Sequence, residues 1–171
     1  MSERLPWAVP AAEVDWDAAF ADLLPRVYNY CRYRVGNDAV AEDLTSRTFE
    51  KAWTQRAKYR RDLAGLATWL FSIARNVAVD HLRAQRPHLP LEAADGVAAA
   101  GTPHDDVVRM SDLERLAALL KRLPAREQEL VALKYGAEAT NRAIAALTGL
   151  SESNVGTILH RTIQELRADW S

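Results

Sequence analysis

The chain has 171 residues, of which 49% are hydrophobic and 26% charged, a composition typical of a globular protein with one domain or two small ones. Its single cysteine, Cys31, excludes an internal disulfide framework and fits a reducing cytoplasm. No apolar stretch approaches the roughly 20 residues of a membrane span, and residues 1–20 lack the features of a signal peptide. We therefore expect a cytoplasmic protein.

The net charge of −1 hides a strong asymmetry along the chain. Residues 26–88 carry 12 Lys or Arg and 6 Asp or Glu, whereas residues 1–25 and 89–117 each have a net charge of −4. A basic block between two acidic segments indicates a polyanionic partner. An unevenly charged, solvated surface explains the same pattern, so charge alone leaves both interpretations open.

Helical periodicity dominates the chain, and no alternation of apolar and polar residues predicts a strand. The sequence therefore predicts an all-α fold of two small helical domains. We assign the first domain to residues 1–86. Its helices are expected at about 15–35, 38–57 and 66–86, with a basic loop at 58–65. Pro25 is expected near the start of a new helix, where its missing N–H is harmless, and Gly36 is expected to end that helix.

A different composition follows the first domain. Residues 87–110 are rich in Pro, Ala, Gly and acidic residues and keep no apolar period, which predicts a flexible linker. We assign the second domain to residues 111–171. Its helices are expected at about 111–122, 125–135, 140–148 and 152–168.

The last two of these helices have the pattern of a helix-turn-helix motif. Thr140 is expected to cap the first helix, Gly149 to end it, and Ser151 to cap the second. In such a motif the second helix lies in the major groove, where its N-terminal residues meet base edges. Its face opposite the apolar stripe carries short hydrogen-bonding side chains, which suit close approach to DNA. An ordinary helical hairpin with a polar face remains the alternative for this segment.

Three blocks, taken together, resemble the extracytoplasmic-function (ECF) sigma factors of bacterial RNA polymerase. The blocks AEDLTSRTFEKAW (41–53) and TWLFSIARNVAVDHLR (68–83) are similar to sigma region 2. The block LKRLPAREQELVALKY (120–135), with the motif behind it, is similar to sigma region 4. The resemblance implies a protein that joins core RNA polymerase, recognises two promoter elements and helps to open the DNA.

The resemblance also assigns residues to three surfaces. In region 2, one helix face would bind the clamp helices of the polymerase β′ subunit: Glu42, Asp43, Arg47, Glu50 and Lys51. The same region would bind the −10 element through Lys58, Tyr59, Arg60, Arg61, Trp69, Arg75, Asn76 and Arg83. Region 4 would meet the β flap and read the −35 element through Ser153, Asn154, Thr157, His160, Arg161 and Arg142.

Elementary chemistry fits the −10 assignment, because cationic side chains neutralise phosphates and Tyr59 offers a stacking surface. Simpler roles remain open for several of these residues. Trp69 is at least as well explained as part of the core, and Arg75 and Asn76 as helix residues with ordinary partners. Gly156 and Ile158 stand where the family's recognition helix often carries basic residues, which indicates weaker −35 binding or a different promoter sequence.

Other functions are less well supported. The sequence has no P-loop, no nucleophile elbow and no His pair at ligand spacing, so we expect neither an enzyme nor a bound metal or other cofactor. A helix-turn-helix regulator that does not bind core polymerase is the main competitor. The resemblance further implies control by an anti-sigma partner. The long linker suggests that the two domains clamp together, or around such a partner, in the inactive state.

Overall fold

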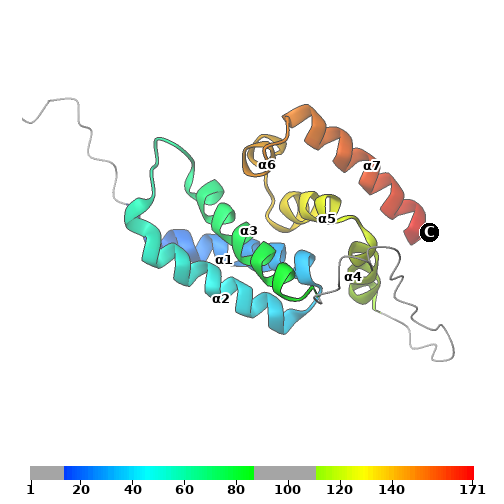
Figure 1. Cartoon of the computed structure of the whole chain (residues 1–171), viewed down its shortest axis with the longest axis horizontal. Coiled ribbons are helices and arrows are strands. Elements are labelled where there is room, and N and C mark those ends of the chain that lie inside the picture. Colours follow the sequence, from blue (N-terminus) through cyan, green and yellow to red (C-terminus); the bar gives the residue numbers. More distant parts are fainter. Residues whose placement is uncertain (1–13, 87–110) are drawn as a thin grey trace, which may run out of the picture.

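The structure, a computed structural model, describes residues 14–86 and 111–171, and all of their regular secondary structure is helical (Figure 1). The predicted all-α fold is thus confirmed. In chain order the elements are α1 (Trp16–Val35), α2 (Asp38–Gln55), η1 (Arg56–Lys58), α3 (Leu66–Ala84), α4 (Asp112–Arg122), α5 (Ala125–Val131), η2 (Ala132–Gly136), α6 (Asn141–Thr148) and α7 (Glu152–Trp170). The predicted linker lies outside the described residues, and the domain boundaries stay a prediction.

Short local signals set most helix ends. The side chains of Asn37, Thr140 and Ser151 each accept a hydrogen bond from the backbone N–H three residues later, which satisfies a donor of the first turn. Gly36 and Gly149 end α1 and α6 in the left-handed region, with φ of 66° and 77°. The predicted caps of the helix-turn-helix motif are therefore confirmed.

The prediction for Pro25 is wrong, because α1 continues through it without a break. Proline has no N–H, so the carbonyl of Ala21 loses its partner within the helix. Both residues are exposed, and water can bind that carbonyl. Leu23 and Val27, on the opposite face, are buried and hold both parts of α1 against the same core.

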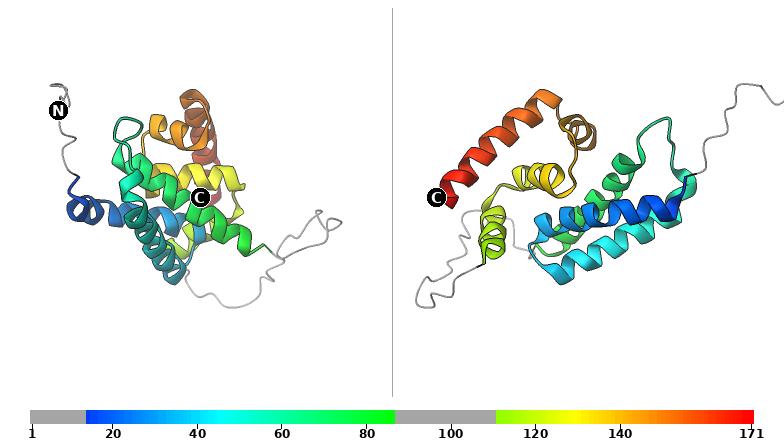
Figure 2. Two further views of the ribbon diagram at one scale, coloured as in Figure 1. Left: turned by 60° about the vertical axis from the view of Figure 1, so that its left-hand side comes forward. Right: turned by 180° about the vertical axis from the view of Figure 1, so that it is seen from behind.

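The first half of the molecule is a three-helix unit in which α1, α2 and α3 pack on one another. Its core includes Leu44, Leu70 and Phe71, and the ring of Phe71 meets the buried ring of Tyr30 edge to face at 6.0 Å. In the second half, α5 and α6 lie against this unit, and α7 lies on their outer side (Figures 1 and 2).

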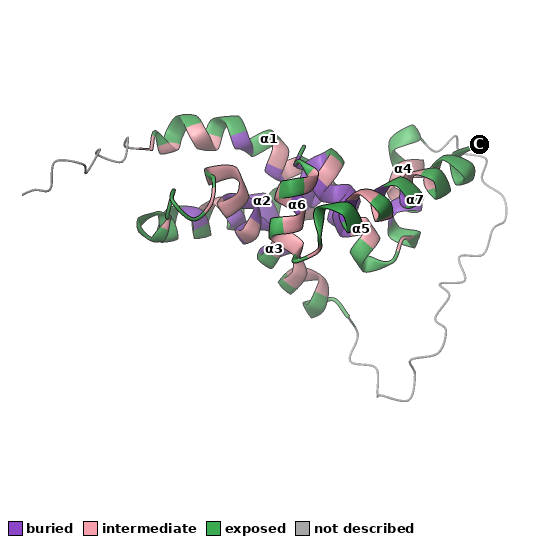
Figure 3. Cartoon of the chain, turned by 90° about the horizontal axis from the view of Figure 1, so that it is seen from above, coloured by how far each residue is buried: buried purple, intermediate pink, exposed green. Residues whose placement is uncertain are grey.

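The two halves share one continuous core. Buried residues run from the three-helix unit into α5 (Figure 3), and η2 packs directly on α1. The approach is closest at Gly136, where an added Cβ atom would lie 2.9 Å from the backbone N and Cα of Tyr30. Only glycine permits such a contact between two backbones. The expected clamping of the two domains is therefore the arrangement that the structure has.

Polar contacts from the first half hold the second half in place. Arg26 Nε donates to the carbonyl of Ala137 at 2.8 Å. Arg75 forms an ion pair with Glu129 at 2.6 Å and also donates to the carbonyl of Leu147 at 2.9 Å. Hydrogen bonds with a charged partner contribute about 1.5–3 kcal/mol when they are shielded from water. These contacts fix the register of the two halves.

Candidate functional site

The exposed face of α7 is the first candidate surface. At 100° per residue, Ser153, Asn154, Thr157, His160 and Arg161 fall within an arc of about 120° opposite the buried stripe. That stripe contains Val155, Leu159 and Thr162, all of which are buried. All five residues of the face are exposed, as is Arg142 on α6. The structure thus brings the predicted −35 residues together on one motif.

Two details modify this face. Arg161 forms an ion pair with Glu127 of α5 at 3.2 Å, but its side chain is 62% exposed, so the pair is weak and its guanidinium is available to a phosphate. Gly156 faces Asn141 of α6, whose Nδ2 an added Cβ would meet at 3.6 Å. The glycine therefore lies on the flank towards α6, beside the proposed DNA-contacting face.

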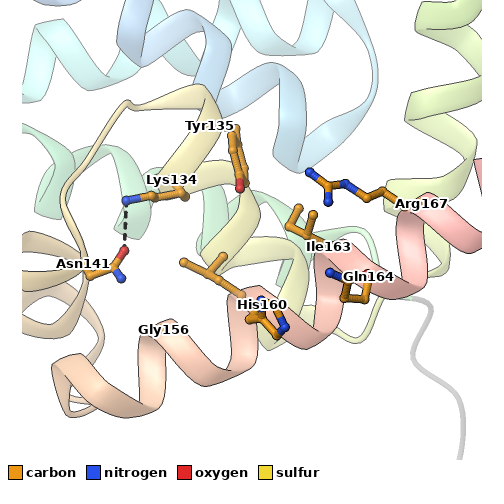
Figure 4. Close-up of a pocket in the computed structure, with 9 residues that line it drawn as sticks. Lys134, Tyr135, Asn141, Gly156, His160, Ile163, Gln164 and Arg167 are labelled. Atoms are coloured by element: carbon orange, nitrogen blue, oxygen red, sulfur yellow. Dashed lines mark hydrogen bonds between the residues drawn. The ribbon is translucent and has the colours of Figure 1, made fainter.

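A hollow of about 290 Å³ lies along that flank, between α7 and η2 (Figure 4). Figure 4 shows Lys134 and Asn141 at one end, where Lys134 Nζ donates to Asn141 Oδ1 at 2.9 Å. His160 and Gln164 border it from α7. The hydrogen bond ties η2 to the start of α6, which helps to fix the motif on the rest of this half.

The basic stretch between α2 and α3 is the second candidate surface. Lys58, Arg60 and Arg61 are exposed, and Arg60 pairs with Asp62 at 2.7 Å within the loop. This hydrogen bond raises the pKa of Arg60 above its ordinary value and lowers the pKa of Asp62. The loop therefore presents cations to solvent, as a surface for phosphates requires.

A cluster of aromatic rings packs together at this loop. The rings of Tyr59 and Trp69 lie 5.2 Å apart, and Trp16 contacts each of them edge-on at 5.9 Å. The Tyr59 hydroxyl donates to the carbonyl of Ala64 at 3.2 Å, which closes the loop. Tyr59 and Trp69 are thus partly buried in a cluster and are not free platforms, although both keep some exposed area.

Sequence reasoning missed a cation at the start of the loop. Arg56 lies over the ring of Trp53, with 3.8 Å from its guanidinium carbon to the ring centroid. Trp53 is 47% exposed, so its ring lies outside the buried core. Their spacing of three residues on a helix places the two side chains on one face, and this was the signal available in the sequence.

The remaining predicted −10 residues do not join this cluster. Arg75 is turned towards the second half, where Glu129 binds it and raises its pKa above the ordinary value. Asn76 is exposed beside it, and Arg83 lies near the end of α3, about 21 Å along the helix from Trp69. The eight predicted residues thus separate into the loop cluster, a middle pair and Arg83.

The third surface is the outer face of α2. The predicted polymerase-binding residues Glu42, Asp43, Arg47, Glu50 and Lys51 are all exposed there. Arg47 pairs with Asp43 at 2.9 Å, one turn apart. Ala41, Leu44 and Thr48 on the opposite face are buried against α1 and α3. The buried side of α2 therefore holds this face in place, and the face carries both acidic and basic side chains.

Two other kinds of site are not found within the described ranges. Residues 14–86 and 111–171 contain no group of three His, Cys, Asp or Glu side chains placed to hold a metal ion. In the same residues, no helix combines the length and the apolar character needed to cross a bilayer.

Comparisons with known proteins identify both halves. Residues 19–88 match the family described as Sigma-70 region 2, and residues 113–166 match Sigma-70, region 4. The chain is 32% identical to the ECF RNA polymerase sigma factor BldN of Streptomyces coelicolor, over 96% of this chain and 65% of BldN. It thus spans less than two thirds of the length of that relative.

Two further comparisons cover nearly whole proteins. The chain is 30% identical to the ECF RNA polymerase sigma factor SigL of Mycobacterium tuberculosis, over 96% of this chain and 93% of SigL. Its fold is similar to that of the sigma factor RpoE of Bartonella quintana, solved in complex with the anti-sigma factor NepR. The TM-score is 0.70 at 22% identity, over 90% of this chain and 95% of that one. The chain belongs to the ECF RNA polymerase sigma factors of the sigma-70 family, which are DNA-binding transcription initiation factors.

Proposed function

We propose that this chain directs core RNA polymerase to promoters, reading the −35 element with α7 and the −10 element with the loop between α2 and α3. The observation that carries the proposal is the α7 face, where five short or cationic polar side chains are exposed opposite a fully buried stripe. Such residues reach base edges and phosphates in the major groove. The proposed site of action is the cytoplasm, where polymerase and promoters are found.

The −10 role rests on the loop cluster. Three exposed cations suit the phosphates of a single strand, and the partly exposed rings of Tyr59 and Trp69 suit stacking with unpaired bases. The outer face of α2 is the proposed contact with the β′ clamp helices. This contact would use neither the exposed face of α7 nor the loop between α2 and α3, so polymerase and DNA can bind at the same time.

The closed arrangement of the two halves is proposed to be inactive. The −10 and −35 elements are about 25 base pairs apart, or about 85 Å along the duplex. The longest helix, α1, spans only about 30 Å, and the halves are in contact. The 24 residues of 87–110 extend to about 80 Å at most, which is enough to let the halves separate. Opening would also release Arg75 from Glu129.

An anti-sigma partner is the proposed means of control. The sigma factor RpoE of Bartonella quintana was solved with an anti-sigma factor, and its fold matches this chain over both halves. We propose that a protein of this kind binds the chain and keeps its halves together. Core polymerase and such a partner would then compete for the same molecule.

Transcription in vitro with purified core polymerase tests the proposal. Promoters are first selected from a random-sequence library, and initiation is then measured with the native chain and with His160→Ala/Arg161→Ala. We expect specific initiation with the native chain. The double variant should lose it, because it lacks two of the side chains that we propose contact the −35 element. Tight binding to duplex DNA without binding to core polymerase would instead identify the free-standing regulator. A matched control is Glu165→Ala, an exposed α7 residue outside the proposed face.

A further inference from the structure

A pocket rich in arginine lies where the two halves meet. Arg34 of α1, Arg83 near the end of α3, Arg86 just after that helix and Arg126 of α5 all line it, around a volume of about 350 Å³. Three elements from both halves therefore build its wall. None of the three surfaces described above explains why four guanidinium groups gather at this place.

The pocket has a large excess of positive charge. Glu129 is the one carboxylate among the described residues of the lining, and its two oxygens are bound to Arg75 at 2.6 Å and 3.3 Å. Among the described residues, no carboxylate lies within 4.0 Å of any of the four lining arginines. Four guanidinium groups and one carboxylate give the lining a charge of +3. Like charges repel one another, and an anion bound among them removes that repulsion.

Arg34 is the strongest indication of a ligand. It is only 5% exposed, and its buried Nε has no hydrogen-bond partner within residues 14–86 and 111–171. Its Nη1 reaches only two neutral oxygens, the Ala125 carbonyl and Gln128 Oε1, both at 3.4 Å. A buried donor without a partner is costly, and a buried guanidinium normally has an anion. The side chain is thus held in place with donor capacity unused.

We infer that this pocket binds a small phosphate-bearing anion. The planar fork of arginine matches phosphate oxygens in pairs, and several such forks favour an anion with more than one charge. The volume is at the lower end of the range for small-molecule sites, about 300–1,000 Å³. Because both halves form the wall, the bound anion stabilises the closed arrangement, as any ligand stabilises the state that it binds.

Calorimetric titration of the full chain with inorganic pyrophosphate, at constant ionic strength, tests the inference. We expect one saturable site in the native chain. Arg126→Gln in one half and Arg86→Gln in the other should each weaken binding about tenfold or more, the effect of losing one charge-assisted hydrogen bond. The control is Arg122→Gln, which removes an exposed charge from the same half but does not line the pocket. It should leave the affinity unchanged.

Four results would overturn the inference. One is the absence of saturable binding, and another is an equal loss in all three variants, which would indicate diffuse attraction. A loss in only one of Arg126→Gln and Arg86→Gln would place the site in one half. Tighter binding of citrate than of pyrophosphate would exclude selectivity for phosphate. Circular dichroism of each variant without ligand shows whether it is folded, so that a folding defect is not counted as lost binding.

Discussion

Replacing Gly136 with alanine tests whether the two halves are closed through direct backbone contact. The new Cβ would lie 2.9 Å from the N and Cα of Tyr30 and 3.0 Å from the carbonyl carbon of Asn29. Carbon atoms in ordinary contact are about 3.5–4.0 Å apart, so η2 and α1 must separate by about 0.6 Å or more. Over-packing of this kind costs about 1–3 kcal/mol. Because the clash exists only while the halves touch, the closed-to-open ratio should fall about 5- to 150-fold.

Small-angle scattering of the full chain gives the readout, with helicity by circular dichroism measured alongside. We expect Gly136→Ala to increase the radius of gyration while helicity is retained, and to bind core polymerase more tightly. Gly65→Ala is the matched control, because no atom lies within 4 Å of a Cβ at that position. An unchanged radius, equal changes in both variants, or lost helicity without expansion would each refute the reasoning.

Three further predictions concern the loop, a helix cap and the core. Lys58→Ala/Arg60→Ala/Arg61→Ala should weaken promoter opening more than polymerase binding and reduce the salt exponent of single-strand binding by about 2; equal losses would place these residues at the polymerase interface. Ser151→Ala should lower the free energy of unfolding by about 1 kcal/mol in urea titrations, because it removes the cap of α7. Burial raises the pKa of the Cys31 thiol to about 11 and leaves the residue 0% exposed, so at pH 8 Ellman's reagent should label the native chain at least about 100-fold more slowly than the urea-unfolded chain. The free energy of unfolding should fall as the pH rises from 9.0 to about 11, since the unfolded state loses this proton first, and Cys31→Ala should reduce the fall.

Local signals account for what the sequence predicted well. The caps at Thr140 and Ser151 act within three residues, so both partners of each hydrogen bond are visible in a short stretch of sequence. The buried stripe of α7 repeats at helical spacing, and its opposite face therefore follows from the sequence alone. Pro25 is the exception, because whether proline breaks a helix depends on the packing of Leu23 and Val27, which the sequence does not show.

Contacts between the halves were not predictable in the same way. Arg75 and Glu129 are 54 residues apart, and no periodicity connects them. Helix periodicity shows only that Arg75 is a cation next to Asn76. It does not show that Glu129, the partner of Arg75, lies on α5. Arg34 is similar, since only the folded chain reveals that an arginine among apolar neighbours is buried and incompletely bonded.

The distance between the halves tests the central claim most directly. Dyes at Asp22 of α1 and Asp169 of α7, both exposed, would report that distance by energy transfer. We predict that transfer is higher in the free chain, which has the closed arrangement, and falls once core polymerase and promoter DNA are bound. Unchanged transfer on a transcribing complex would contradict the account, because the closed chain is too short to reach both promoter elements.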